Sequence, residues 1–212
     1  MCGIAGHIGD GKITDPIMKR TLALMQNRGP DFKSFHKTEI KNKNILLLHS
    51  RLSIIDLESR SNQPFFKDGL VIVFNGEIYN YQTLKKQLHL KEFSSNSDTE
   101  VILEGYLEQG SSFFKLLRGI YAFAIIDFRE KVELILVRDP GGVKPLYYKE
   151  NAGMMFASEI KAIKAISDQN SSFEEKSIKQ YLNLGFIPEP NTVYKDIHSI
   201  QPGYILKFSN NK

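Results

Sequence analysis

The apolar runs of this 212-residue sequence are strand-sized, and this is the feature that most limits what the chain can fold into. The main runs lie at 45–48, 70–74 and 120–126, well short of the roughly 18 apolar residues that a membrane helix needs. The N-terminus has no basic start followed by an apolar stretch, so no secretory signal is expected. We therefore expect a chain rich in strands that makes no contact with a membrane.

Two pairs of predicted strands are joined by short turns, as in β-hairpins. Residues 120–127 and 132–137 flank a charged turn, and residues 146–148 and 154–157 flank a turn at 151–153. Single strands are predicted at 2–8, 45–48 and 70–74, and helices at 15–25, 81–88, 98–108, 159–166 and 177–184. Hairpins with helices between them indicate an α+β chain with antiparallel sheets.

Two polar motifs lie at the ends of these elements. Asn75 and Gly76 follow the strand at 70–74 and predict a turn, because this dipeptide favours positive φ. Residues 97–100 read Ser-Asp-Thr-Glu, the capping-box pattern, and predict a helix that begins there and ends at Gly110.

The character of the sequence changes near residue 167. Residues 1–166 are predicted to form one domain. The segment that follows begins with a polar stretch, contains the short helix at 177–184 and then carries three prolines. We therefore expect residues 167–212 to be a connector with one short helix.

Composition narrows the classes of function. The net charge is +4 and the lysines are scattered, so a nucleic-acid partner is not expected. The single cysteine excludes an internal disulfide framework and a Cys-rich zinc site, and favours a reducing compartment, the cytoplasm. The five histidines do not have the spacing of a metal site, so no metal is expected.

The only cysteine, Cys2, could be a nucleophile. A small residue at position 2 favours removal of Met1, which would leave Cys2 with a free α-amine. That amine and the thiol have ordinary pKa values of about 8 and about 8.5, so the amine can accept the thiol proton near neutral pH. A buried cysteine can also be just a small apolar residue, and Cys2 alone favours neither interpretation.

Several motifs follow in order along the chain. After Met-Cys-Gly-Ile come RGPD (28–31), HSRLSIID (49–56), NGEIYN (75–80), SDTE (97–100), RD..GVKPLYY (138–148) and FASEIKAI (156–163). Each motif by itself has a structural explanation, such as a surface ion pair, a turn or a helix start. Together they closely resemble the N-terminal glutaminase domain of the glutamine-hydrolysing asparagine synthetases, which are class II glutamine amidotransferases. The resemblance covers essentially the whole chain.

The resemblance implies the N-terminal nucleophile hydrolase fold, a four-layer αββα sandwich of two antiparallel sheets flanked by helices. Cys2 should lie at the end of the first strand, between the sheets. It would attack the side-chain amide of glutamine and form a thioester. The Asn75 side chain and the Gly76 N–H are then the expected oxyanion donors.

The resemblance also implies a partner for each of the two charged termini of a free glutamine, its α-carboxylate and its α-ammonium group. Arg51 is expected to bind the α-carboxylate, and Asp98, helped by Glu77, the α-ammonium group. The other expected members are Leu52, Ser53, Ile54 and Ile55 along the pocket wall, with Asn75 and Gly76, and Arg28 and Asp31 in the surrounding loop.

The expected partners are L-glutamine and a synthetase domain or chain that receives the ammonia. No cofactor is expected in this chain. ATP and magnesium belong to the synthetase domain, which should begin beyond residue 212, and its Ser-Gly-Gly-x-Asp-Ser loop does not occur here. A homodimer is a further possibility.

One departure from the family lies in the RD motif, where Pro140 and Gly141 replace an arginine and a bulky apolar residue. A changed loop is expected there. The sequence leaves two alternatives open. The ammonia could serve a sugar or antibiotic precursor instead of aspartate, or the chain could be a non-catalytic module that binds glutamine or a partner.

Overall fold

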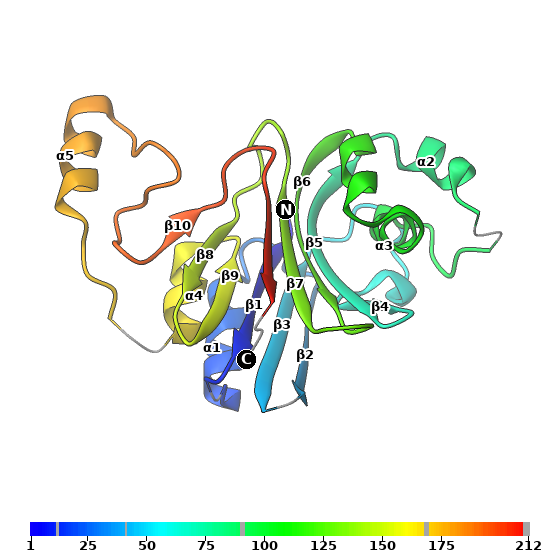
Figure 1. Cartoon of the computed structure of the whole chain (residues 1–212), viewed down its shortest axis with the longest axis horizontal. Helices are drawn as coiled ribbons and strands as arrows, with labels where there is room; N and C mark the ends of the chain where they lie inside the picture. The colour runs from blue at the N-terminus through cyan, green and yellow to red at the C-terminus, as the bar shows by residue number, and fades with distance from the viewer. Residues whose placement is uncertain (12, 41, 90–91, 168–169, 210–212) are drawn as a thin grey trace.

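The computed structural model describes residues 1–11, 13–40, 42–89, 92–167 and 170–209, and it contains two antiparallel sheets that lie face to face (Figure 1). In the first sheet the strand order is β10-β8-β9-β1-β3-β2. The second has the order β11-β7-β6-β5-β4. Every pair of neighbouring strands is antiparallel.

The strands of the first sheet are β1 (Gly3–Gly9), β2 (Phe32–Ile40), β3 (Lys43–Arg51), β8 (Tyr147–Glu150), β9 (Gly153–Ala157) and β10 (His198–Ser199). Those of the second are β4 (Phe65–Lys67), β5 (Leu70–Ile78), β6 (Gly119–Asp127), β7 (Glu133–Arg138) and β11 (Ile205–Ser209). The helices are α1 (Asp15–Leu24), α2 (Tyr81–Gln87), α3 (Asp98–Gln109), α4 (Ile160–Ser167) and α5 (Glu175–Leu184), with short 3₁₀ turns at Ser59–Ser61 and Gly110–Leu116.

Side-chain alternation along the strands creates four layers. On β5, Val71 and Val73 face the first sheet, whereas Ile72 and Phe74 face α3. The outer face of the first sheet is covered in the same way by α1 and α4, where Leu46 packs among their buried side chains. The fold is therefore the expected αββα sandwich, and the α+β class is confirmed.

The predicted elements are largely confirmed. Both hairpins, β6–β7 and β8–β9, form, and all five predicted helices are present within one or two residues of their expected starts or ends. Strands β2 and β4 are not predicted from the sequence. Strand β2 is charged and partly exposed along its whole length, so it has no strong apolar pattern to reveal it.

The predicted turn at Asn75-Gly76 is wrong, because both residues lie inside β5. Asn75 pairs with Ala122 and Gly76 with Tyr121 of β6. A side chain at Gly76 would place its Cβ 2.3 Å from the Ile120 carbonyl oxygen. The glycine therefore permits close approach of two strands instead of a chain reversal.

The segment predicted as a connector also contributes strands that were not foreseen. β10 pairs with β8 in the first sheet, and β11 pairs with β7 along the edge of the second. Leu206 and Phe208 of β11 pack against the core between the sheets, so the strand buries apolar surface. Helix α5 extends away from the sheets (Figure 1). Residues 168 and 169 of the polar stretch lie outside the described residues.

Candidate active site

Cys2 lies immediately before β1, at a pocket between the two sheets. Its Sγ accepts a hydrogen bond from the Leu52 N–H at 3.4 Å and lies 3.6 Å from the Leu52 carbonyl oxygen. Burial raises the pKa of the Cys2 thiol, and the Leu52 N–H, the N-terminal amine and the Arg51 charge oppose that rise. The thiol thus lies against one pocket wall with positive charge nearby.

Most of the residues predicted for the site line this one pocket. They are Cys2, Arg51, Leu52, Ile54, Ile55, Asn75, Gly76, Glu77 and Asp98. These residues come from segments that are distant in sequence. β1 and β3 belong to one sheet and β5 to the other, so the pocket forms where the two sheets meet. Ser53, Arg28 and Asp31 are not among the pocket-lining residues.

Asn75 is fully buried on β5, and neither its amide oxygen nor its amide nitrogen has a hydrogen-bond partner. An unpaired buried amide is costly in a folded protein, typically about 1–3 kcal/mol. Because the residue lines the same pocket as Cys2, its amide is available to a ligand there. This is the pattern of a group kept for function at some cost in stability.

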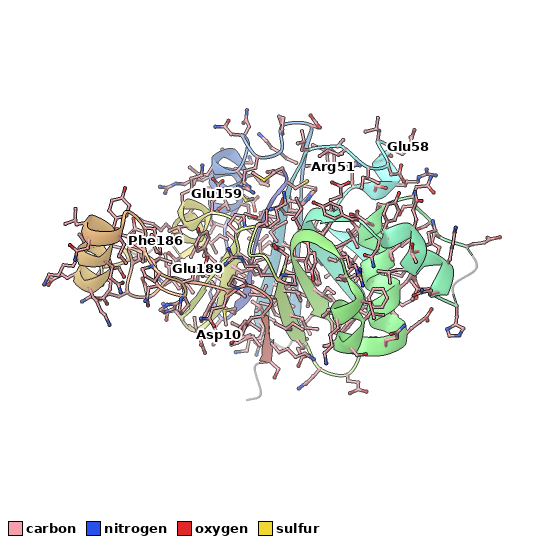
Figure 2. All side chains as sticks on the ribbon, turned by 90° about the horizontal axis from the view of Figure 1, so that it is seen from above. Asp10, Arg51, Glu58, Glu159, Phe186 and Glu189 are labelled. Carbon is pink, nitrogen blue, oxygen red and sulfur yellow. The ribbon has the colours of Figure 1, made fainter. Side chains whose placement is uncertain are left out.

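Arg51 ends β3 and is only 5% exposed. Its Nη1 donates to the Glu58 carbonyl oxygen at 3.2 Å and to Asn62 Oδ1 at 2.6 Å. Its Nη2 donates to the carbonyl oxygen of Asp56. Figure 2 shows Arg51 and Glu58 on the same side of the molecule, near the short helix at Ser59–Ser61. Arg51 therefore also holds the pocket-side loop in place.

Asp98 is the first residue of α3 and is 4% exposed. One carboxylate oxygen accepts a hydrogen bond from the Ile78 N–H at 3.0 Å. Burial, together with the charge of Glu77, raises the pKa of Asp98 to about 6 against the opposing effect of its backbone hydrogen bonds. Two carboxylates thus lie near each other in the pocket, an arrangement that attracts a cation.

Arg28 and Asp31 hold the pocket walls from outside. Arg28 Nε donates to the Cys2 carbonyl oxygen at 3.0 Å. One oxygen of Asp31 accepts a hydrogen bond from the Ser53 N–H at 2.7 Å. Arg28 thus holds the main chain at Cys2, and Asp31 holds it at Ser53, next to Leu52 of the pocket wall.

Several pocket residues were missed by sequence reasoning: Met1, Ser61, Gln63, Phe74, Ser97, Thr99, Ile120 and Lys144. Gln63 joins two elements, since its Oε1 accepts from the Phe74 N–H at 2.6 Å and its Nε2 donates to Thr99 Oγ1 at 3.2 Å. Nothing local in the sequence indicates this bridge. Lys144 lies in the RD..GVKPLYY motif, so the motif itself was the available signal.

Met1 lies at the pocket beside Cys2 and is 55% exposed. Burial lowers the pKa of its α-ammonium group.

Among the described residues, no group of three or more His, Cys, Asp or Glu side chains is placed to hold a metal ion. The same residues contain no helix that is both long and apolar enough to cross a bilayer.

A sequence profile described as "Glutamine amidotransferase domain" matches residues 1–212. The chain belongs to the glutamine amidotransferase domain family. Among curated relatives of this amidotransferase domain, asparagine synthetase [glutamine-hydrolyzing] 3 of Bacillus subtilis is 34% identical over 220 residues. That match covers 99% of this chain and 35% of the relative. The amidotransferase domain described here thus spans about a third of that relative's length.

Solved structures share the fold of this amidotransferase domain. The glutamine phosphoribosylpyrophosphate amidotransferase of B. subtilis matches 78% of the chain and 44% of its own, with a TM-score of 0.64 at 22% identity. The structure titled an allosteric regulatory enzyme of purine biosynthesis matches 99% of the chain and 47% of its own, with a TM-score of 0.71 at 20% identity. These matches confirm the fold described above, the αββα sandwich of two antiparallel sheets.

Proposed function

We propose that this chain hydrolyses the side-chain amide of L-glutamine with the Cys2 thiol as nucleophile. The observation that carries the proposal is the fully buried and unpaired Asn75 amide, which lines the same pocket as Cys2. An unpaired donor beside a nucleophile is what an oxyanion intermediate needs. Membership of the amidotransferase family supports the same chemistry.

In the proposed mechanism, removal of Met1 frees the α-amine of Cys2, which accepts the thiol proton. The thiolate attacks the amide carbon of glutamine, and the oxyanion that forms is stabilised by the Asn75 side chain and the Gly76 N–H. The C–N bond then breaks, and the nitrogen takes the proton from the α-amine and leaves as ammonia. Water attacks the resulting thioester, which releases glutamate and restores the thiol.

The two charged groups on the α-carbon of the substrate would each be bound by a side chain of opposite charge that lines the pocket. Arg51 would bind the α-carboxylate, because its guanidinium group is already held in place by loop carbonyl oxygens. Asp98 and Glu77 would bind the α-ammonium group, whose charge stabilises the ionised form of Asp98. A free amino acid is thereby distinguished from a glutamine side chain within a peptide.

We further propose that the ammonia serves ATP-dependent asparagine synthesis, carried out in the cytoplasm by a synthetase domain or chain. Support comes from the names of the relatives, which are asparagine synthetases that hydrolyse glutamine. ATP and magnesium would bind in that synthetase part.

The test is glutamate release from L-glutamine by the purified chain, on samples whose intact mass shows that Met1 is absent. Cys2→Ala should abolish turnover while the thermal unfolding midpoint stays unchanged.

Asn75→Ala should lower kcat by about 100-fold to 1,000-fold, the usual effect of losing one oxyanion donor. The matched control is Asn44→Ala, because Asn44 lies at the far end of β3, opposite Gly9. Turnover by Cys2→Ala, or none by the processed wild-type chain, would contradict the proposal.

A further inference from the structure

Lys144 is a cation in the active-site pocket to which the mechanism above assigns no role. It lies in the loop between β7 and β8, is 7% exposed, and lines the same pocket as Cys2, Gly76 and Glu77. A lysine is rarely buried to this extent unless it is paired. Its place in the pocket therefore calls for a chemical explanation.

The main chain of Lys144 is held on both sides. Asp139 Oδ2 accepts a hydrogen bond from the Lys144 N–H at 3.0 Å, and Arg138 Nε donates to the Lys144 carbonyl oxygen at 2.8 Å. Both of these partners are themselves buried. The loop is therefore fixed where the side chain enters the pocket.

The ammonium group of Lys144 differs from that of Lys149, which is also buried, and from that of Lys67, which is partly buried. Lys149 is 3% exposed and its Nζ lies 2.7 Å from Asp196, and Lys67 Nζ lies 3.1 Å from Glu100. Among the residues that the structure describes, no carboxylate forms an ion pair with Lys144. Its positive charge is thus left available within the pocket.

The charged groups around the pocket limit what Lys144 can do. The ammonium group of Lys144 interacts with the charges of Arg28, Cys2, Asp139 and Glu77. Besides Lys144, the charges that act on the Cys2 thiol are those of the N-terminal amine, Arg51 and Asp98. Burial and the Arg28 charge lower the pKa of Lys144, whereas Cys2 and Asp139 raise it. Of the two nearby arginines, Arg28 is bound to the Cys2 carbonyl oxygen and Arg51 to loop acceptors.

We propose that Lys144 is a positioning residue that acts through Cys2, where its ammonium group stabilises the thiolate before glutamine is attacked. This inference rests on the proposed glutaminase function. Lys144 keeps its proton throughout, since the thiol proton goes to the α-amine and later to ammonia. The lysine thus offsets the burial that otherwise disfavours the charged sulfur.

The experiment measures the pH dependence of alkylation of Cys2 by iodoacetamide, on the processed chain without glutamine. Cys2 is the only cysteine, so the mass increase reports this thiol alone. Lys144→Met should raise the apparent pKa of the thiol by about 1 unit, the usual effect of losing one nearby opposite charge. Lys144→Arg should restore the wild-type value. Lys131→Met is the control, because Lys131 lies outside the pocket, 3.5 Å from Glu133.

Steady-state kinetics give a second readout. Lys144→Met should lower kcat/KM for glutamine at neutral pH by about tenfold, and the loss should shrink as the pH rises, because the thiolate then forms without the lysine. An unchanged thiol pKa in both Lys144→Met and the milder Lys144→Gln, each with a wild-type unfolding midpoint, would overturn the inference. So would a rise in KM alone, which would mark Lys144 as a substrate contact.

The two proposals fail in different ways. If the wild-type chain releases no glutamate, the glutaminase proposal fails, yet alkylation still reports whether Lys144 stabilises the thiolate. If the chain hydrolyses glutamine and the thiol pKa is the same with and without Lys144, only the role of Lys144 is refuted.

Discussion

Single residues in the pocket are kept in states that a stable core would avoid. Asn75 is buried without a partner, and Asp98 is a buried carboxylate whose ionisation is disfavoured by burial and by Glu77. A bound glutamine would satisfy both groups: the oxyanion would accept a hydrogen bond from Asn75, and the α-ammonium group would pair with Asp98. These two side chains therefore give the proposed function its most direct structural support.

The first prediction concerns the pH dependence contributed by Asp98. The pKa of this carboxyl group is raised to about 6, so in the free enzyme it loses its negative charge as the pH falls through 6. If it binds the α-ammonium group, kcat/KM for glutamine should fall below pH 6 through a rise in KM. Measured glutaminase rates from pH 5 to pH 8 check this outcome.

The matched comparison uses two aspartates that each begin a helix, Asp98 in α3 and Asp15 in α1. Asp98→Asn should raise KM at neutral pH and remove its dependence on pH near 6. Asp15→Asn should leave the profile as in the wild type, because Asp15 is exposed and outside the pocket. A normal KM in Asp98→Asn would refute the binding role.

At the scale of elements, the local sequence pattern predicted the position of α3 correctly, but not the hydrogen bonds at its start. Ser97 is the N-cap, yet its side chain makes no capping hydrogen bond. The Glu100 carboxylate accepts from the Ser94 and Ser95 N–H groups at 2.9 and 2.7 Å, and so fixes the loop ahead of the helix. The predicted helix is confirmed. The hydrogen bonds of a capping box, between the Ser97 and Glu100 side chains and the backbone of the first turn, are replaced by bonds from Glu100 to the preceding loop.

The second prediction concerns packing of α3 against the 3₁₀ turn at Gly110–Leu116. Ala in place of Gly105 would favour the helix by about 1 kcal/mol. Its Cβ, however, would lie 2.1 Å from the Phe113 ring, so the ring would have to move. Overpacking of this kind costs about 1–3 kcal/mol, and we expect Gly105→Ala to lower the free energy of unfolding in urea.

Gly11→Ala is the control for the Gly105 experiment, since the nearest atom to its new Cβ would be 3.4 Å away in His7. That variant should be as stable as the wild type or slightly more stable. If Gly105→Ala instead increased stability, helix propensity would outweigh packing at this position.

At the scale of the whole molecule, Arg138 connects the C-terminal segment to the active-site loop. The guanidinium group donates to Glu189 Oε1 at 2.8 Å, Ser199 Oγ at 2.9 Å and the Gly142 carbonyl oxygen at 2.7 Å, in addition to Lys144. Residues beyond the predicted domain limit at 166 are therefore bonded to the loop that carries Lys144. By contrast, Phe186 lies near α5 at one end of the molecule, away from Arg51 (Figure 2).

The third prediction is that Arg138→Lys lowers the free energy of unfolding by at least about 2 kcal/mol. Lysine cannot reproduce the planar fork of donors, so buried acceptors such as the Gly142 carbonyl oxygen lose their partner. Urea unfolding measures the loss. Arg20→Lys is the control, because Arg20 is exposed on α1 and its replacement should change stability by less than about 1 kcal/mol. Equal effects of the two substitutions would contradict the structural role.

The sequence by itself determined the α+β class, both hairpins, the helices and most of the pocket residues. Those features depend on local periodicity or on motifs that can be read in order along the chain. Only the tertiary structure decided that Asn75-Gly76 is strand, that β10 and β11 complete the sheets, and that Gln63 and Lys144 join Cys2. The reason is physical: sheet pairing and burial bring together residues far apart in the chain, and no local propensity specifies those contacts.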